Sequence, residues 1–348
     1  MSLVQRHAPM DGTPPGPTAA REAAWRNCIK LFAVTLVAGI ALCAVTILAF
    51  DPYDSGRFPT FMPAGISDNT PRTANASRGR DLRFNSVVIG NSHTQLVDPA
   101  RLSSATGLRF VQMTVPGTGP REQMTLLRYF MRHHQRVGAI VIGVDDLWCT
   151  DNSDMQVINP FPFWLYGNTV DYVTHSLGSR AFVLIWRRVL IALDRLQPTD
   201  PAGYWDYELG SERAFHPTLD DVPVVDLSPR KGPPRLFPAL DLLDRTIADL
   251  PSDTPVIVMM PPRFRSAMPA PDTDAQKTVV ACKAEIIRRF SEKPGRLFAD
   301  FLTDTPVNRD PVNYMDDAHY RAPVARMIEQ RLSREILAQA PRPAGASQ

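Results

Sequence analysis

Residues 84–94 read FNSVVIGNSHT, an apolar run that ends at a glycine and is followed by small polar side chains. A run of this length with Val-Val-Ile at its centre predicts a buried strand. In a parallel sheet, the loop after Gly90 would lie at the carboxyl edge, where open α/β folds bind ligands. Ser92 in this loop is therefore the first candidate functional residue.

Further apolar runs and helical spacings follow along the chain. The runs predict strands at residues 109–115, 139–144, 255–260 and 296–302. The spacing of apolar side chains predicts helices at residues 121–134, 275–290 and 324–337. Strands that alternate with helices are typical of a parallel sheet covered by helices on both faces, so the expected fold class is α/β.

A twenty-residue stretch from Leu31 to Phe50 contains no charged residue. As a helix with a rise of about 1.5 Å per residue, it matches the roughly 30 Å hydrocarbon layer of a bilayer. Basic residues precede it and Asp51 and Asp54 follow it, which predicts a cytoplasmic N-terminus and an exported remainder. A cleaved signal peptide is the competing interpretation. The run is longer than the usual h-region of about 7 to 15 residues, which favours an uncleaved anchor.

This helix divides the chain into four expected parts. Residues 1–27 are rich in Pro, Gly, Ala and Thr without apolar periodicity, which predicts a disordered cytoplasmic tail. Residues 28–50 form the transmembrane helix, residues 51–80 a juxtamembrane linker, and residues 81–348 the exported domain.

An insertion interrupts the exported domain at residues 151–235, where the regular pattern gives way to aromatic and proline-bearing loops with one expected helix at residues 180–196. Its aromatic side chains could form a platform for stacking on sugars or could cover the sheet, and core packing is the favoured interpretation. They are Trp164, Tyr166, Tyr172, Trp186, Tyr204, Trp205 and Tyr207.

Composition and cysteine spacing exclude several classes of protein. The chain has 348 residues, 44% apolar and 21% charged, with a net charge of +2 and no basic block, so we expect no nucleic-acid partner. No CxxC or HExxH spacing occurs, so the sequence gives no support for a zinc site. We expect neither a metal site nor a cofactor. Cys149 and Cys282 are the two cysteines of the exported domain. They could pair in an oxidising compartment or remain two buried thiols.

A second group of chemically significant residues lies just ahead of the last predicted helix, where residues 316–320 read DDAHY. A carboxylate at Asp316 can turn back to the Nδ1 atom of His319, which leaves Nε2 free to take a proton from a serine. Taken separately, each of these groups is of a kind that is common in loops without any catalytic role. Together they supply a nucleophile, a base and an orienting carboxylate in the order Ser, Asp, His, and acyl transfer is the reaction that such a set serves.

With these residues the sequence resembles the SGNH, or GDSL-like, hydrolase superfamily over roughly residues 84 to 340, apart from the insertion. Residues 90–93, GNSH, look like the first block of that family around its serine. Asp316 and His319 look like its last block, Asp-x-x-His. Gly117 matches the second block, a glycine that gives an oxyanion-hole N–H. The resemblance implies a three-layer parallel-sheet domain, with the N–H groups of Ser92 and Gly117 as oxyanion donors.

The third block departs from the family. Where the family has Gly-x-Asn-Asp, residues 143–146 read GVDD. A carboxylate can donate to an oxyanion only when it is protonated, so the third oxyanion donor is left open at Asp145.

The membrane-anchored arrangement is similar to the branch that includes alginate O-acetylation proteins and their relatives. It implies a single-pass protein of a bacterial inner membrane with a periplasmic domain, an esterase or O-acetyltransferase acting on a cell-envelope or secreted polysaccharide, and a membrane partner that supplies an acyl donor. The alternative is a catalytically inactive SGNH-like module that binds polysaccharide or a biosynthetic partner, and Asp145 favours it.

Overall fold

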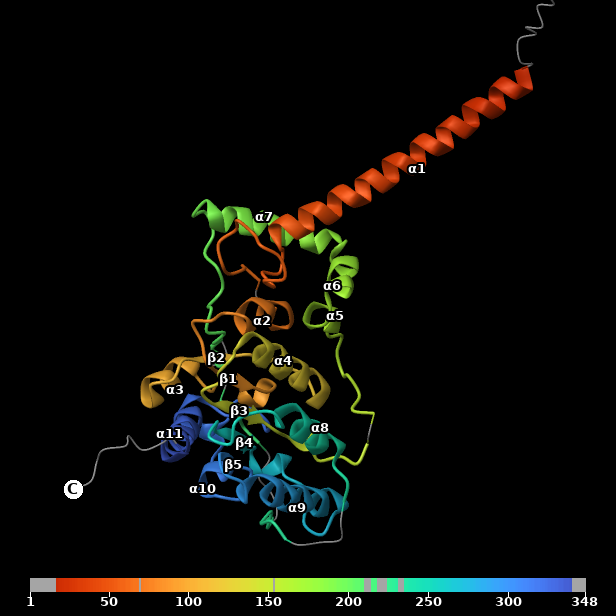
Figure 1. The fold of residues 1–348 in the computed structure, drawn as a ribbon. Coiled ribbons are helices and arrows are strands. Elements are labelled where there is room, and N and C mark those ends of the chain that lie inside the picture. The colour runs from red at the N-terminus through yellow and green to blue at the C-terminus, as the bar shows by residue number, and fades with distance from the viewer. Residues whose placement is uncertain are drawn as a thin grey trace, which may run out of the picture.

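Five parallel strands form the centre of the structure, in the spatial order β2-β1-β3-β4-β5 (Figure 1). This computed structural model describes residues 17–68, 70–152, 154–209, 214–217, 224–230 and 235–339. The strands are β1 (Ser86–Ile89), β2 (Phe110–Gln112), β3 (Ile140–Gly143), β4 (Val256–Met260) and β5 (Arg296–Asp300). All residues of β1, β3 and β4 are buried, as expected for strands covered on both faces.

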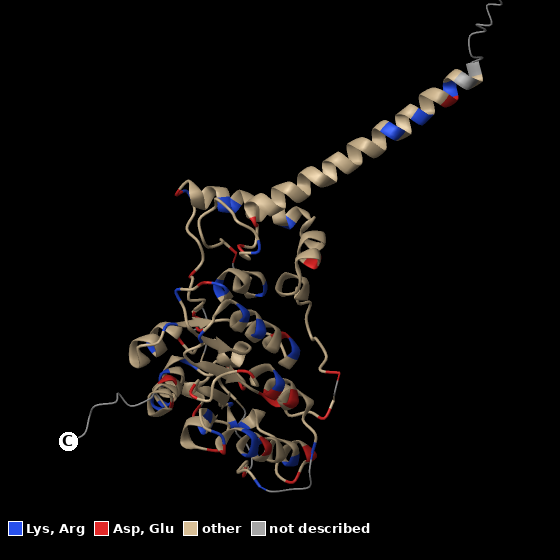
Figure 2. Cartoon of the chain, in the orientation of Figure 1, with Lys and Arg blue, Asp and Glu red and all other residues tan. Residues whose placement is uncertain are grey.

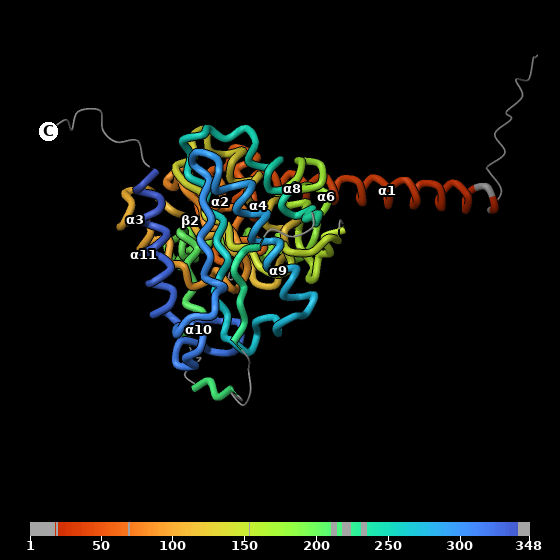
Figure 3. The backbone as a smooth tube through the Cα atoms, turned by 90° about the horizontal axis from the view of Figure 1, so that it is seen from below, coloured from red at the N-terminus to blue at the C-terminus, as the bar shows by residue number. Residues whose placement is uncertain are grey.

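Helices cover both faces of the sheet. α3 (Pro99–Thr106) and α11 (Ala322–Gln339) pack on one face, and α4 (Pro120–His133), α8 (Pro238–Ile247) and α9 (Asp274–Ile286) pack on the other. Figure 3 shows these two groups on opposite sides. The expected three-layer α/β fold with a parallel sheet is confirmed.

Several elements differ from the sequence expectations. A loop was expected between the first two strands, but the chain forms the 3-10 helix η1 (Ser92–Thr94) and then α3. The helix expected over residues 275–290 changes after Ile286 to the π-helical turn η4 (Ile287–Ser291). The remaining short elements are α2 (Pro71–Gly79), α5 (Phe163–Tyr166), α6 (Thr169–Ser176), α7 (Ser179–Ala192), α10 (Pro306–Arg309), η2 (Asp146–Trp148), η3 (Arg265–Ala267) and η5 (Pro311–Asn313).

The N-terminal helix α1 (Pro17–Phe50) projects from the domain. Among the described residues it is the one helix long and apolar enough to cross a membrane. Part of the expected tail, residues 17–27, is helical and continuous with the apolar run, and residues 1–16 lie outside the described residues.

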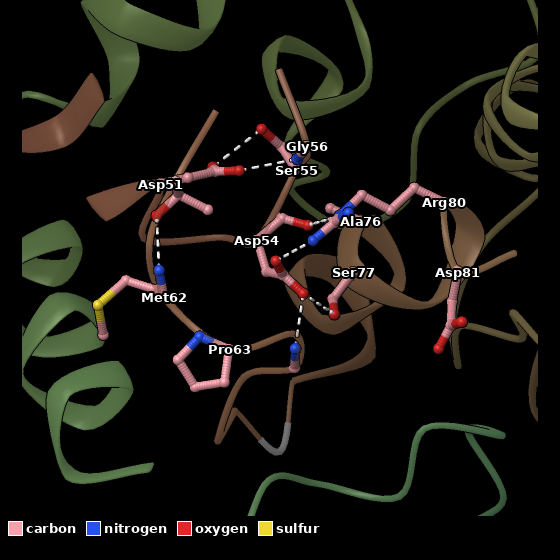
Figure 4. Close-up of polar contacts among 12 residues, drawn as sticks. Asp51, Asp54, Ser55, Gly56, Met62, Pro63, Ala76, Ser77, Arg80 and Asp81 are labelled. Atoms are coloured by element: carbon pink, nitrogen blue, oxygen red, sulfur yellow. Dashed lines mark hydrogen bonds and ion pairs between the residues drawn. The ribbon is translucent and has the colours of Figure 1, made fainter. Parts of the chain in front are cut away.

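The segment expected as a linker, residues 51–80, is folded and includes α2, and Figure 4 shows the polar contacts within it. The carboxylate of Asp51 accepts hydrogen bonds from Ser55 Oγ at 2.9 Å and from Gly56 N–H at 2.7 Å. Asp54 accepts from Gly65 N–H at 2.7 Å and pairs with Arg80, which follows α2. These contacts fix the turns of the segment, and the hydroxyl of Tyr172 in α6 donates to Asp51 Oδ1 at 2.6 Å and so connects the end of α1 to the domain.

Cys149 and Cys282 form a disulfide with a Cα–Cα distance of 5.4 Å. Of the two interpretations that the sequence left open, a disulfide or two buried thiols, the structure has the disulfide. It joins the segment after β3 to α9, two parts of the chain separated by 133 residues.

The aromatic side chains of the insertion divide into two groups. Tyr166 and Tyr172 are buried in the core, and Trp164 packs edge-on against Tyr53 with ring centroids 5.3 Å apart. Core packing is confirmed for these. Trp186 and Trp205 are exposed.

Candidate active site

The loop after β1 places Ser92 at the carboxyl edge of the sheet. The side chain of Asn91 caps η1 by accepting a hydrogen bond from His93 N–H at 3.1 Å, which starts the tight turn at Ser92. Gly90 is required just before it, because a Cβ atom there would lie 2.4 Å from the Oγ1 atom of Thr94. The residues around the serine therefore fix the course of its backbone.

The loop before α11 folds around the carboxylate of Asp316. Its Oδ1 atom accepts hydrogen bonds from the backbone N–H groups of Ala318 and His319, each at 2.8 Å. The Nδ1 atom of His319 lies 2.9 Å from both carboxylate oxygens. The loop is held in turn by the N–H of Phe264, which donates to the carbonyl of Asp317 at 3.0 Å.

The structure brings Ser92, His319 and Asp316 together. The Oγ atom of Ser92 lies 2.9 Å from the Nε2 atom of His319, although the two residues are 227 positions apart. With the proton of the imidazole held on Nδ1 against Asp316, Nε2 is the acceptor for the serine hydroxyl. This is the geometry that a general base needs in order to take the proton of a nucleophile.

Asp316 is held in its charged form. Partial burial raises the pKa of its carboxyl, but the hydrogen bonds from Ala318 N–H and from His319 outweigh that effect, so its pKa lies below the ordinary value. The carboxylate is thus available to stabilise a positive charge on His319 at neutral pH.

The buried carboxylate of Asp145 faces the same loop. Its Oδ2 atom accepts a hydrogen bond from Asn91 Nδ2 at 2.6 Å, and its Oδ1 atom accepts from Leu147 N–H at 3.0 Å. Asp145 therefore acts as an acceptor in this arrangement. The sequence predicted that Asp145 belongs to the site, but it did not predict the hydrogen bond with Asn91.

Gly117 lies in a loop that runs against the serine loop. Val115 N–H donates to the carbonyl of Gly90 at 2.9 Å, and Asn91 Nδ2 reaches the carbonyl of Thr118 at 3.4 Å. Gly117 has a φ of 64°, and a Cβ atom there would lie 2.6 Å from the Nδ2 atom of Asn159. The left-handed backbone conformation favours glycine at this position, and a Cβ atom would also displace the side chain of Asn159.

His93 is a site residue that the sequence analysis did not single out. Its ring lies 5.2 Å from the ring of His319, and its Nδ1 atom lies 3.6 Å from Asp145 Oδ2. His93 also lines a mainly apolar cavity of about 390 Å³ beyond the ends of β3 and β4. Its position directly after Ser92 was visible in the sequence, but nothing there indicated a cavity.

An ion pair lies at this cavity. Arg263 donates to Asp146 Oδ1 at 2.6 Å, and both residues contribute to the lining. Burial raises the pKa of Asp146, but the hydrogen bond and charge of Arg263 outweigh it and hold the pKa below its ordinary value. The structure thus places Arg263, three residues after the end of β4, against the cavity.

Two aromatic residues of the insertion approach the histidine. The ring centroid of Tyr207 lies 5.2 Å from that of His319, and Trp205 lies 5.5 Å from Tyr207. Trp205 is 54% exposed. An accessible aromatic surface therefore adjoins the serine–histidine pair.

Within the described part of the chain, no group of three or more His, Cys, Asp or Glu side chains is placed to hold a metal ion. Comparison with known families gives no matching family model, and no curated protein matches the chain. Among solved structures the chain is similar to a protein described as a GDSL-like lipase from Bacteroides ovatus, with 13% sequence identity and a TM-score of 0.35. The match covers 74% of this chain and 55% of the other, so it spans about half the length of that protein. At this identity and TM-score the likeness says nothing about activity or substrate.

Proposed function

We propose that the chain is a membrane-anchored serine ester hydrolase or O-acyltransferase that acts on acyl esters of a cell-envelope or secreted polysaccharide. The observation that carries this proposal is the 2.9 Å contact between Ser92 Oγ and His319 Nε2, with Asp316 against the other ring nitrogen. A serine hydroxyl is a useful nucleophile only when a base beside it can take its proton.

In this mechanism Ser92 Oγ attacks the carbonyl carbon of the ester while His319 Nε2 takes the hydroxyl proton. Asp316 stabilises the imidazolium that forms. When the tetrahedral intermediate collapses, the bond to the leaving oxygen breaks and His319 gives its proton to that oxygen. Water or a sugar hydroxyl then attacks the acyl-serine, gives its proton to His319, and releases Ser92, which recovers the proton.

Two backbone N–H groups, those of Ser92 and Gly117, are the proposed oxyanion donors. The hydrogen bonds that hold the Gly117 loop against Gly90 and Asn91 support this assignment. Preorganised donors of this kind are each worth about 2.7–4 kcal/mol of transition-state stabilisation. We assign Asp145 a positioning role, because its oxygens already accept two hydrogen bonds.

The proposed location is a bacterial inner membrane, with α1 as an uncleaved anchor and the domain in the periplasm. Arg26 and Lys30 precede the apolar run and Asp51 follows it, which favours a cytoplasmic N-terminus. The disulfide between Cys149 and Cys282 supports an oxidising compartment for the domain.

The polysaccharide substrate is supported by the exposed ring of Trp205 and by Tyr207 beside His319. Aromatic rings with an accessible apolar face suit the flat apolar faces of sugar rings. If the enzyme transfers acyl groups to a periplasmic glycan, an activated acyl donor must reach that side of the membrane. A membrane partner that supplies it is therefore part of the proposal.

The test uses the purified full-length protein in detergent with 4-nitrophenyl acetate, with and without a polysaccharide acceptor. We expect release of nitrophenolate and labelling by a fluorophosphonate, both abolished in Ser92→Ala and unchanged in the exposed control Ser104→Ala. Acetylation of the acceptor would identify a transferase, and release of acetate alone a hydrolase. Equal labelling of the wild type and Ser92→Ala, with no turnover of either ester or acceptor, would refute the catalytic proposal and favour a binding module.

A further inference from the structure

Helix α7 (Ser179–Ala192) is apolar on both of its faces. Ala181, Leu184 and Ile185 on the inner face are buried against the domain. The outward face carries Phe182, Val183 and Trp186, with exposed fractions of 40%, 51% and 60%. An apolar face of a helix is normally covered by a protein core or by a membrane, whereas the outward face of α7 exposes its large apolar side chains.

The orientation of α7 is fixed by a buried ion pair. Arg188 and Asp54 are each only 1% exposed, and Arg188 Nη1 lies 3.0 Å from Asp54 Oδ1. Arg188 also donates to the carbonyl of Pro63 at 3.0 Å. Asp54 is the centre of the polar contacts drawn in Figure 4. Because Arg188 points inward into this network, α7 cannot turn its outward face toward the domain.

The corner between α6 and α7 lies beside the apolar run of α1. Leu177 and Phe182 share a groove of about 460 Å³ with six residues of α1 between Phe32 and Cys43. At a rise of about 1.5 Å per residue, Cys43 lies roughly 10 Å along the helix from its end at Phe50. Any bilayer that α1 spans with residues 31–50 therefore contains Leu177 and Phe182 at the depth of its hydrocarbon.

The arginines and the tryptophan of α7 are arranged as expected for a helix that lies where the hydrocarbon layer meets the lipid headgroups. Arg180 pairs with Asp68 at 2.9 Å, and Arg187 donates to the carbonyl of Ser67 at 2.9 Å, so both bend toward the segment that follows α1. Figure 2 shows few charges along α7 and the adjoining half of α1. Trp186 has the amphipathic ring that is enriched where hydrocarbon meets headgroups.

We propose that the outward face of α7, together with the corner at Leu177, is inserted into the leaflet at the C-terminal end of α1, with lipid acyl chains as its occupant. This inference rests on the proposed membrane anchor but not on the proposed catalysis. Two attachments to one bilayer, a spanning helix and an interfacial helix, fix the height and tilt of the domain. The carboxyl edge of the sheet is then held at a constant position relative to the membrane surface.

The test uses full-length protein in which Cys28 and Cys43 are replaced by Ser and the disulfide is kept. A single cysteine is introduced by Val183→Cys or, as a matched control, by Val312→Cys at an exposed apolar position near α10, at the end of the domain away from α1 (Figure 1). Each variant is labelled with the fluorophore NBD and reconstituted into vesicles of phosphatidylcholine and phosphatidylglycerol.

We expect doxyl-labelled phosphatidylcholine to quench the label at position 183 about threefold or more over its effect at position 312, and aqueous iodide to show the reverse order. Quenching of both labels by iodide alone would overturn the inference. Protection of position 183 from both quenchers would overturn it too, because the face would then be covered by a second copy of the protein. Fluorophosphonate labelling of Ser92, measured on the same vesicles, reports separately on the proposed function.

Discussion

The Nδ2 atom of Asn91 donates a 2.6 Å hydrogen bond to Oδ2 of Asp145 and so joins the loop after β1 to the segment after β3. The carbonyl oxygen of the same amide accepts from His93 N–H at 3.1 Å. Asn91 cannot flip its amide without losing both bonds. The direction of the serine loop therefore depends on a fixed donor at position 91 and a fixed acceptor at position 145.

Exchanging these two residues gives a specific test of that dependence. In Asp145→Asn alone, one amide oxygen keeps the bond from Leu147 N–H, so an NH₂ group faces the NH₂ group of Asn91. We expect a loss of about 1–3 kcal/mol in the free energy of unfolding and a fall in kcat. In the double variant Asn91→Asp with Asp145→Asn, residue 145 donates and residue 91 accepts, so the hydrogen bond forms again in the opposite direction. We expect this variant to recover much of the lost free energy of unfolding and much of the lost kcat. Thermal denaturation and ester hydrolysis measure the effect. A double variant no better than Asp145→Asn would show that the pair does not act as a unit.

Replacing Asp316 by Asn should reduce kcat by about 10²–10⁴-fold while leaving KM nearly unchanged. An amide can donate to Nδ1 of His319 and so favours the tautomer that carries its proton on Nε2, which cannot accept the proton of Ser92. The matched control is the neighbouring exposed residue in Asp317→Asn, which should hydrolyse 4-nitrophenyl acetate at the wild-type rate. Equal rates for Asp316→Asn and this control would remove Asp316 from the mechanism.

The sequence predicted the parts of the site that follow directly from strand order. Ser92 follows a buried strand, and the carboxyl ends of parallel strands meet at one edge of a sheet. The short loop of Asp316 and His319 could be foreseen as a unit, because a carboxylate three residues before a histidine can reach its ring. α3 was also open to prediction, since Asp98 caps it and Gly107 ends it in the left-handed conformation.

Other parts of the site depend on contacts that no local pattern encodes. Asp145 meets Asn91 across 54 residues, and Tyr207 reaches His319 from an insertion without regular periodicity. The pairing of Cys149 with Cys282 depends on packing of α9 against the segment after β3. Such contacts form only in the complete tertiary fold, so local sequence patterns could not predict which of these residues meet.

Breaking the disulfide should destabilise the domain and disturb the cavity. The bond closes a loop of more than a hundred residues, for which its loss is expected to cost about 2–5 kcal/mol. Cys149 also lines the cavity that His93 borders. We therefore expect Cys149→Ser with Cys282→Ser to lower both Tm and kcat, and dithiothreitol to lower the Tm of the wild type toward that of the variant. The variant itself is the control, since its Tm should not respond to the reductant.

Trp205→Ala should weaken use of a polysaccharide acceptor without affecting a small ester. Loss of one aromatic stacking contact worth about 0.5–1.5 kcal/mol corresponds to a rise of about 2- to 13-fold in KM for the acceptor. Leu209→Ala is the matched control, because Leu209 is a large exposed apolar residue of the same segment. Equal KM values in the two variants would show that the exposed ring is not part of the acceptor site.

The buried pair of Asp54 and Arg188 should make the stability of the protein sensitive to acid. Burial raises the pKa of Asp54, but Arg188, Arg80 and the hydrogen bonds from Ser77 and Gly65 outweigh it, so the folded-state pKa lies below the ordinary value. A carboxyl with a depressed folded-state pKa contributes stability that is complete above its unfolded pKa of about 3.9 and is lost as the pH falls through the folded value. Asp54→Asn leaves the charge of Arg188 buried without its partner, which should cost about 3–5 kcal/mol at pH 7.

The gap in Tm between wild type and Asp54→Asn should therefore stay constant from pH 7 down to about pH 4 and narrow below it, because only the wild type loses this contribution. Circular dichroism of the full-length protein in detergent micelles measures both curves. Asp253→Asn, at an exposed position, is the control and should follow the wild type throughout. A gap that persists unchanged to the lowest pH at which both proteins stay folded would mean that the charge of Asp54 does not contribute to stability. The attachment of α7 to the segment after α1 would then depend on packing and on the contacts of Arg180 with Asp68 and of Arg187 with the carbonyl of Ser67.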